Sequence, residues 1–426
     1  MRTESIEVKK GITLHQIKTN KFKTDLIAIF ISIPLKKETV TMDCIIPAVL
    51  RRGTKNLKTQ EDINKKLDMM YGATFDCGIE KIGDNHVIKF YIEYINDLFL
   101  PTNENKLEEK INLILDIVFN PLLENDVFVD KYVQSEKENI RKKIRAKIDN
   151  REQYAQEKCI QEMYADEPYG LYKYGQEEDL DKITSKKLYE YYIKLVNDAK
   201  IDIFVSGDVD EEKVTDLVTN NLCLKKLNAR EPQYIINNEQ TEKKKEVKEK
   251  RKEEILDIIQ GKLILGLDIL ENKKDMRFAA SIYNIILGES ATSKLFQNVR
   301  EKASLAYSAR SSYIRQKNNI FIKCGIEIKN YEKALNIIYK QLDDMKQGNF
   351  TDEDIENAKK YMINGINSVE EEQDTQITYY MGQELSGLNT SLEEYKNKIQ
   401  ELTKKEIVDI ANKIQINTVY FLKNSD

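Results

Sequence analysis

Histidine is scarce in this chain, since only His15 and His86 occur among 426 residues. A metal site rich in histidine, or a serine–histidine relay, would have to draw on these two side chains. Both lie in segments that read as strands, with no catalytic motif around them. The sequence therefore favours structural or surface roles for both histidines.

Cysteine is also sparse, and the spacing of its residues excludes two classes of site. The five cysteines are scattered, odd in number and without a CxxC pair, which argues against a disulfide framework and a thiolate metal site. They are Cys44, Cys77, Cys159, Cys223 and Cys324. We expect reduced thiols that act mainly as small buried apolar groups.

Long apolar runs and an excess of positive charge are both missing. No run reaches the roughly 18 residues of a membrane span, and residues 1–5 lack the apolar core of a signal peptide. Lys and Arg number 67 against 72 Asp and Glu, a formal net charge of −5. The sequence therefore predicts a cytoplasmic protein with neither a membrane nor a nucleic acid as partner.

The length and the order of elements predict two similar domains. A chain of 426 residues is too long for one ordinary core. The first half reads as strands over 6–17 and 26–33, helices over 41–50 and 59–70, strands over 73–80 and 86–94, then helices and a strand over 200–206. The second half reads as a strand over 255–269, helices over 276–287 and 293–302, strands over 305–314 and 320–328, then helices and a strand over 418–422. This repeat predicts an α+β fold of two homologous domains, each a mainly antiparallel sheet covered by helices.

A charged tract separates the two halves. Residues 239–254 consist mostly of Lys and Glu, a composition that cannot bury a core and is typical of an exposed linker with local helix or strand at most. We therefore expect an N-terminal domain over 1–225, a linker over 226–254 and a C-terminal domain over 255–426.

The strongest local motif lies in the second half. Residues 287–296 read LGESATSKLF, and they lead to VREK at 299–302 and to SLAYS at 304–308. This pattern resembles the C-terminal-domain signature of the pitrilysin/insulinase-type zinc peptidases. In that family an Arg and a Tyr seven residues apart lie near the bound peptide, which matches Arg300 and Tyr307. The alternative is structural, with Arg300 capping a helix end and Tyr307 packing at a domain edge.

The resemblance extends over nearly the whole chain. Residues 49–54, 164–170 and 205–210 are similar to segments of the family's N-terminal domain. The family's zinc motif, H-x-x-E-H, would fall just before Gly53, where Cys44, Pro47 and Ala48 replace its first His, its Glu and its second His. Lys143 stands where the third ligand, a Glu, is expected. The resemblance therefore implies a degenerate metal motif, with no metal and no cofactor bound.

The resemblance also implies a partner. Some members of this family work as pairs, in which one subunit carries the zinc motif and the other the Arg/Tyr half. We expect a catalytically inactive subunit that pairs with a zinc-bearing homologue, or with a second copy of itself, and contributes Arg300 and Tyr307 to a peptide-binding chamber. The alternative is a non-catalytic peptide-binding or assembly subunit. A new nucleophilic site at Cys44, with Lys143 as its base, is a further reading of the same positions.

Overall fold

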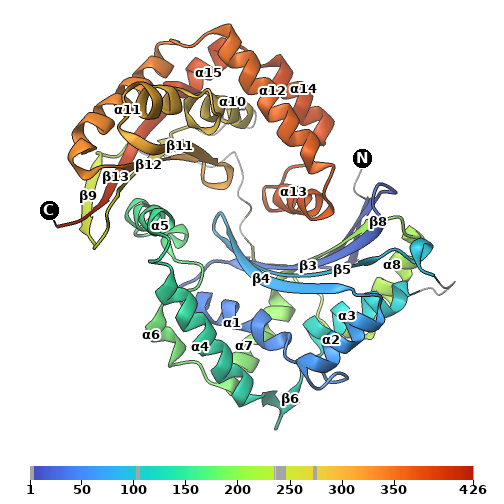
Figure 1. Ribbon diagram of the computed structural model, residues 1–426. Helices are drawn as coiled ribbons and strands as arrows, with labels where there is room; N and C mark the ends of the chain where they lie inside the picture. The colour runs from blue at the N-terminus through green and yellow to red at the C-terminus, as the bar shows by residue number, and fades with distance from the viewer. Residues whose placement is uncertain (1–3, 102–105, 235, 237–245, 272–275, 426) are drawn as a thin grey trace. The chain divides into compact units, whose positions relative to one another are not determined.

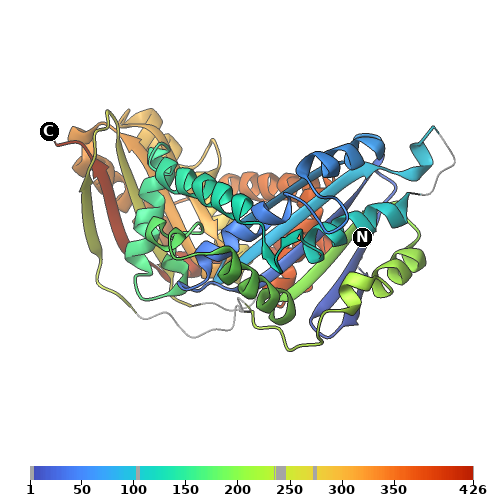
Figure 2. The same cartoon turned by 90° about the horizontal axis from the view of Figure 1, so that it is seen from below.

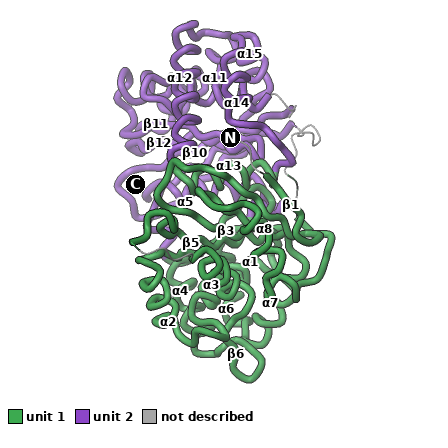
Figure 3. The backbone as a smooth tube through the Cα atoms, turned by 90° about the vertical axis from the view of Figure 1, so that its right-hand side faces the viewer, with its two compact units in different colours: residues 1–145, 171–236, 372–385 green, residues 146–170, 237–371, 386–426 purple. Residues whose placement is uncertain are grey.

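The computed structural model describes residues 4–101, 106–234, 236, 246–271 and 276–425. It contains two compact units, each with one main sheet and the helices that cover it (Figure 3). Unit 1 comprises 1–145, 171–236 and 372–385, and unit 2 comprises 146–170, 237–371 and 386–426. Each half of the sequence thus supplies one short segment to the unit that is built mainly from the other half. The linear boundaries expected at 225 and 255 do not include this exchange of segments.

The sheet of unit 1 has six strands in the order β1-β2-β8-β3-β5-β4. All neighbours are antiparallel except β2 and β8. The strands are β1 (Glu4–Lys9), β2 (Ile12–Lys18), β3 (Thr24–Pro34), β4 (Thr74–Ile82), β5 (Asn85–Ile95) and β8 (Lys200–Gly207). The central strand β3 is almost continuously apolar because both of its faces are buried.

Most helices of unit 1 cover one face of this sheet, and Figure 2 shows several of them in front of its blue strands. They are α1 (Val40–Leu50), α2 (Gln60–Met69), α3 (Leu107–Phe119), α4 (Asp130–Ala146), α6 (Glu177–Leu180), α7 (Ser185–Asp198), α8 (Glu211–Thr219) and α9 (Leu222–Lys225), with a small hairpin of β6 (Leu123–Glu124) and β7 (Val127–Phe128). The helix predicted over 59–70 is present as α2, and the Thr59 side chain accepts a hydrogen bond from the Asp62 backbone N–H as its cap.

Unit 2 repeats the topology of unit 1. Its strand order, β11-β12-β10-β13-β9, corresponds to β4-β5-β3-β8-β2, and each series ends in its one parallel pair. The strands are β9 (Lys250–Ile255), β10 (Gly261–Ile269), β11 (Ala306–Ile314), β12 (Asn319–Ile326) and β13 (Ile414–Lys423). The predicted fold of two homologous, mainly antiparallel sheets with helices is confirmed.

The helices of unit 2 gather mainly on one face of its sheet (Figure 1). They are α10 (Met276–Asn284), α11 (Tyr331–Lys346), α12 (Asp352–Val369), α14 (Leu392–Glu401) and α15 (Lys404–Ala411), with the π-helical segments η3 (Ile285–Glu289) and η4 (Phe296–Lys302). Helix α5 (Arg151–Met163), which the first half of the sequence contributes, covers the other face.

The sequence explains why α5 fits against this sheet. A Cβ atom at Gly266, in the middle of β10, would lie 2.1 Å from the Met163 sulfur, so the bare backbone allows the helix to come close. The Glu254 carboxylate on β9 accepts hydrogen bonds from the hydroxyls of Tyr154 (2.6 Å) and Tyr420 (2.5 Å). These bonds join α5 to β9 and β13.

Helix α13 (Gln373–Leu385) is the reciprocal contribution of the second half to unit 1. Ile377, Met381 and Leu385 recur every four residues and pack as a stripe on the sheet. Their partners on the strands include Ile17, Leu26, Ala28, Phe30, Val87 and Phe204. The Gln373 amide donates to the Ser206 carbonyl at 3.0 Å. Unit 1 is therefore covered on both faces only when the second half is present.

Two predicted segments, 6–17 and the charged linker, contain more regular structure than the sequence indicates. The extended stretch over 6–17 is a hairpin of β1 and β2, because Gly11 turns the chain with a positive φ of 83°. In the expected linker, 235 and 237–245 lie outside the described residues, and 250–255 form the edge strand β9.

Among the described helices, none combines the length and the apolarity that crossing a membrane requires.

Candidate functional site

The four positions of the degenerate metal motif meet in one cavity of unit 1, with a volume of about 370 Å³. Helix α1 brings Pro47 and Ala48 to its wall together with Cys44, and α4 brings Lys143. The other lining residues are Arg51, Arg52, Gln60, Cys77, Gly78, Ile79, Glu136, Asn139, Ile140 and Tyr174. Positions 95 residues apart in the sequence therefore face the same space.

The side chains in this cavity do not fit a zinc ion. The Cys44 thiol donates back to the Val40 carbonyl at 2.9 Å, and its burial raises the pKa of Cys44 well above the usual range. Because the thiolate is the form that binds zinc, this environment disfavours Cys44 as a ligand. Pro47 and Ala48 offer no side-chain donor atom, and the Lys143 ammonium lies 5.5 Å above the Tyr174 ring and repels a cation.

Among the described residues, one carboxylate lines the cavity, and it already accepts hydrogen bonds. Glu136 is buried and accepts a hydrogen bond from Arg52 Nε at 2.6 Å, a second contact from the same guanidinium, and one from the Asn139 amide at 2.9 Å. Hydrogen bonds between a guanidinium and a carboxylate are strong and fix the geometry of the pair. Glu136 is therefore a structural anchor between α1 and α4.

The thiols in the cavity are poorly suited to cysteine chemistry, although Lys143 lines the same space, because burial outweighs its charge and keeps the pKa of Cys44 raised. Burial raises the pKa of the Cys77 thiol to about 11, and this thiol donates to the Pro47 carbonyl at 3.4 Å. No histidine lines the cavity among the described residues. The arrangement thus gives no support to a thiol nucleophile at Cys44 or Cys77.

Both histidines are buried and held by carboxylates. His86 Nδ1 lies 3.0 Å from an Asp43 oxygen, and the other oxygen of Asp43 accepts a hydrogen bond from the Tyr191 hydroxyl at 2.6 Å. This set ties α1 to β5 and α7. His15 Nε2 lies 2.9 Å from Asp202 Oδ1 in the sheet of unit 1. Burial excludes surface roles for both residues.

The described residues contain one group of acidic and histidine side chains close enough to hold a metal, namely His15, Asp202 and Glu384. The Lys200 ammonium lies 2.5 Å from Asp202 and 3.3 Å from Glu384. A lysine already supplies the positive charge that these carboxylates need, so this group is a buried ion-pair network.

Arg300 and Tyr307 lie in unit 2, on consecutive elements. Arg300, on η4, has a side chain that is 45% exposed and stacks at 4.6 Å on the Phe296 ring. Its Nε lies 3.6 Å from a Glu301 oxygen, and no backbone carbonyl of the described residues accepts a hydrogen bond from it. Tyr307 is 68% exposed at a bulge of β11, between the paired residues Ala306 and Ser308. The roles of Arg300 and Tyr307, whether in peptide binding or in structure, therefore stay predictions.

A close contact at Gly288 holds this region in place. A Cβ atom at Gly288 would lie 2.6 Å from the Ser311 backbone nitrogen, so only glycine lets η3 pack against β11. The helices predicted over 276–287 and 293–302 pass into π-helix at 285–289 and 296–302. Short π-helical segments are frequent at functional sites, but the periodicity of the sequence does not predict them.

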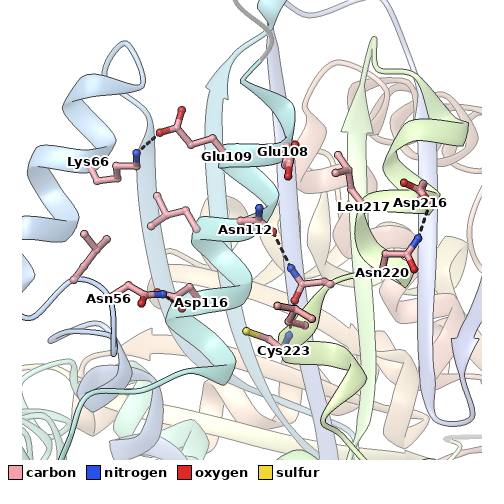
Figure 4. A pocket seen from close by; sticks show the side chains of 14 residues that line it. Asn56, Lys66, Glu108, Glu109, Asn112, Asp116, Asp216, Leu217, Asn220 and Cys223 are labelled. Carbon is pink, nitrogen blue, oxygen red and sulfur yellow. Dashed lines mark hydrogen bonds and ion pairs between the residues drawn. The ribbon is translucent and has the colours of Figure 1, made fainter.

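A larger hollow than this cavity lies elsewhere in unit 1 and is shown in Figure 4. It measures about 890 Å³ and lies among α2, α3, α8 and α9, with none of the predicted site residues in its wall. Its polar groups satisfy one another, as in the pairs Lys66–Glu109, Asn56–Asp116, Asn112–Asn221 and Asp216–Asn220. Its size alone therefore does not make it the functional site.

Comparisons with known proteins agree with this geometry. Residues 182–362 match the family model described as the peptidase M16 inactive domain. The chain is 34% identical to the "Probable inactive metalloprotease YmfF" of Bacillus subtilis, over 98% of this chain and 96% of that protein. It is 22% identical to the "Uncharacterized zinc protease YmxG" of the same organism, over 72% and 74% of the two chains.

Solved structures show the same fold. A conserved protein from Enterococcus faecalis superposes with a TM-score of 0.89 at 26% identity, over 100% of this chain and 99% of the other. A peptidase M16 inactive domain from Pseudomonas fluorescens gives 0.80 at 16% identity with the same coverage. The resemblance to pitrilysin/insulinase-type peptidases is thus confirmed, and the nearly full-length similarity to YmfF shows that the chain belongs to the peptidase M16 family.

Proposed function

We propose that this chain is a non-catalytic M16 subunit that pairs with a zinc-bearing homologue and contributes Arg300 and Tyr307 to peptide binding. One contrast carries the proposal. The cavity at Cys44, Pro47, Ala48 and Lys143 has no ligand set for zinc, whereas Arg300 and Tyr307 stay exposed with few partners of their own. Positioning of a peptide and metal chemistry are separable contributions to catalysis, so two subunits can divide them.

The chemistry of unit 2 suits a peptide ligand. The Arg300 guanidinium offers several donors to peptide carbonyls, and the Tyr307 hydroxyl can donate one more. Tyr307 lies on β11, which is the last strand of its described sheet, and an extended peptide can add to such an edge through backbone hydrogen bonds. The bulge at Tyr307 leaves that residue out of the ladder to β12.

The test is co-expression with the H-x-x-E-H homologue from the same genome, followed by native mass spectrometry and a peptidase assay. We expect a one-to-one complex that carries one zinc. Arg300→Ala should leave the complex assembled and lower kcat/KM roughly 10- to 100-fold, because a charge-assisted hydrogen bond contributes about 1.5–3 kcal/mol.

Arg251→Ala is the matched control, since Arg251 is also a half-exposed arginine of unit 2 but lies on β9. A monomer or homodimer without a zinc-bearing partner would contradict the pairing. An assembled complex with an unchanged rate in Arg300→Ala would favour the second candidate, an assembly or scaffold subunit. The contacts of Arg300 with Phe296 and Glu301 within its own chain favour that candidate. Location in the cytoplasm stays a prediction.

A further inference from the structure

The degenerate metal cavity has an excess of positive charge. Its lining contains three cations, Arg51, Arg52 and Lys143, against the single carboxylate of Glu136. Arg52 is already committed to Glu136. Neither Arg51 nor Lys143 forms an ion pair within the described residues, although the whole chain carries a net charge of −5.

The unpaired charges converge on the same wall. Arg51 and Lys143 both lower the pKa of the Cys77 thiol, although burial has the larger effect and raises it. Both positive charges therefore act on Cys77, which lies on β4. The Lys143 and Lys173 ammonium groups both lie within 6 Å of the Tyr174 ring, at 5.5 and 5.3 Å. A guanidinium and an ammonium that face one space without a counter-charge are the usual arrangement of an anion site.

Part of the remaining wall is apolar, and the volume of the cavity limits the size of a ligand. Pro47, Ala48, Ile79 and Ile140 are apolar, and an apolar wall reduces the screening that water gives to charges. A volume of about 370 Å³ lies near the lower end of the range for small-molecule pockets, which suits one or two residues of a peptide.

We propose that this cavity, which the degenerate metal-motif positions line, binds a carboxylate group of a peptide through Arg51 and Lys143. A planar carboxylate matches the fork of a guanidinium, and Lys143 adds a point charge. The carboxylate can belong to the C-terminus of the peptide or to an acidic side chain. This site goes beyond the proposed pairing, because it lies wholly within unit 1, whereas Arg300 and Tyr307 lie in unit 2.

The test uses the full chain alone, so a missing partner subunit cannot cause its failure. Three probe peptides are titrated by calorimetry at low ionic strength: N-acetyl-Ala-Leu-Ala with a free carboxylate, the same peptide as its amide, and N-acetyl-Ala-Glu-Ala-amide. We expect the free acid to bind at least about tenfold more tightly than its amide. If the peptide with the Glu side chain binds as tightly as the free acid, the site recognises any peptide carboxylate. If it binds more weakly than the free acid, the site recognises C-termini.

Variants of one helix provide the control. Lys143→Gln should weaken the free acid at least about tenfold and leave the amide unchanged. Lys142→Gln should change neither, because Lys142 is exposed like Lys143 but does not line the cavity. Arg51→Gln gives a second variant with the same expectation. Equal binding of acid and amide, equal effects at positions 142 and 143, or binding of inorganic phosphate but of no peptide would each overturn the proposal.

Discussion

The exchange of helix α13 into unit 1 leads to a stability prediction for Met381→Ala. Met381 is 1% exposed and packs, with Ile377 and Leu385, on the sheet face formed by β2, β3, β5 and β8. Truncating a buried Met to Ala removes apolar contacts and leaves a cavity, which costs about 2–5 kcal/mol. A whole protein is stable by only about 5–15 kcal/mol, so one such change removes a large part of the stability of unit 1.

The matched control is Met69→Ala. Met69 ends α2 in the same unit, carries the same side chain and is 75% exposed. Its loss should change the free energy of unfolding by no more than about 0.5 kcal/mol. The pair of variants therefore separates burial beneath α13 from any general effect of losing a methionine.

Hydrogen exchange measured by mass spectrometry suits this test, because a chain with two units need not unfold in one step. In Met381→Ala, the amides of β3 and β8 should lose protection, since they belong to the sheet that α13 covers. The amides of β10 and β12, in unit 2, should lose much less. If β3 and β8 kept their protection, or if Met69→Ala had an equal effect, the assignment of α13 to the core of unit 1 would be wrong.

Two further predictions concern titratable groups in unit 1. Burial raises the pKa of Asp25 from 3.8 to about 6. The folded state therefore keeps this proton to higher pH than the unfolded state does. As the pH rises from about 4 to 6, the protein loses roughly 3 kcal/mol of stability. The uncharged variant Asp25→Asn lacks this loss, so urea denaturation should show its stability rising relative to wild type over that range, and a constant difference would contradict the assignment. Cys44 should resist iodoacetamide in the native chain, because it is buried and its pKa is raised, and react once the chain is denatured; rapid native labelling, seen by peptide mapping, would contradict its burial.

The alignment of the metal motif identified residues that share a cavity in the structure. Alignment of motifs alone placed Cys44, Pro47, Ala48 and Lys143 together, and these residues do share a cavity. This was within reach because the motif has a fixed spacing and the buried residues of α4 recur at helical spacing. The positive charge of the cavity was harder to predict, because the sequence does not show that Arg51 and Lys143 lack an acidic partner.

The exchange of helices could not be derived from the sequence. Helix α5 is absent from the predicted elements, because its apolar positions, such as Tyr154, Cys159 and Met163, are spread among charged residues. Helix α13 has a regular apolar stripe, but the stripe does not tell which sheet it covers. Periodicity identifies a buried face, whereas the identity of the opposite surface depends on tertiary packing.

Helix α1 shows why the fold can persist without the metal motif. Pro47, in its interior, removes a backbone hydrogen bond and costs about 3 kcal/mol. Every residue of α1 except Ala48 is buried, and Ile45, Ile46 and Leu50 alone gain about 1.5–3 kcal/mol each from leaving water. The burial of these three side chains exceeds the cost of the proline, and the Arg52–Glu136 pair joins the end of α1 to α4. The elements that would carry a metal are therefore held by packing and by this ion pair, which leaves the motif positions free to take on a different ligand.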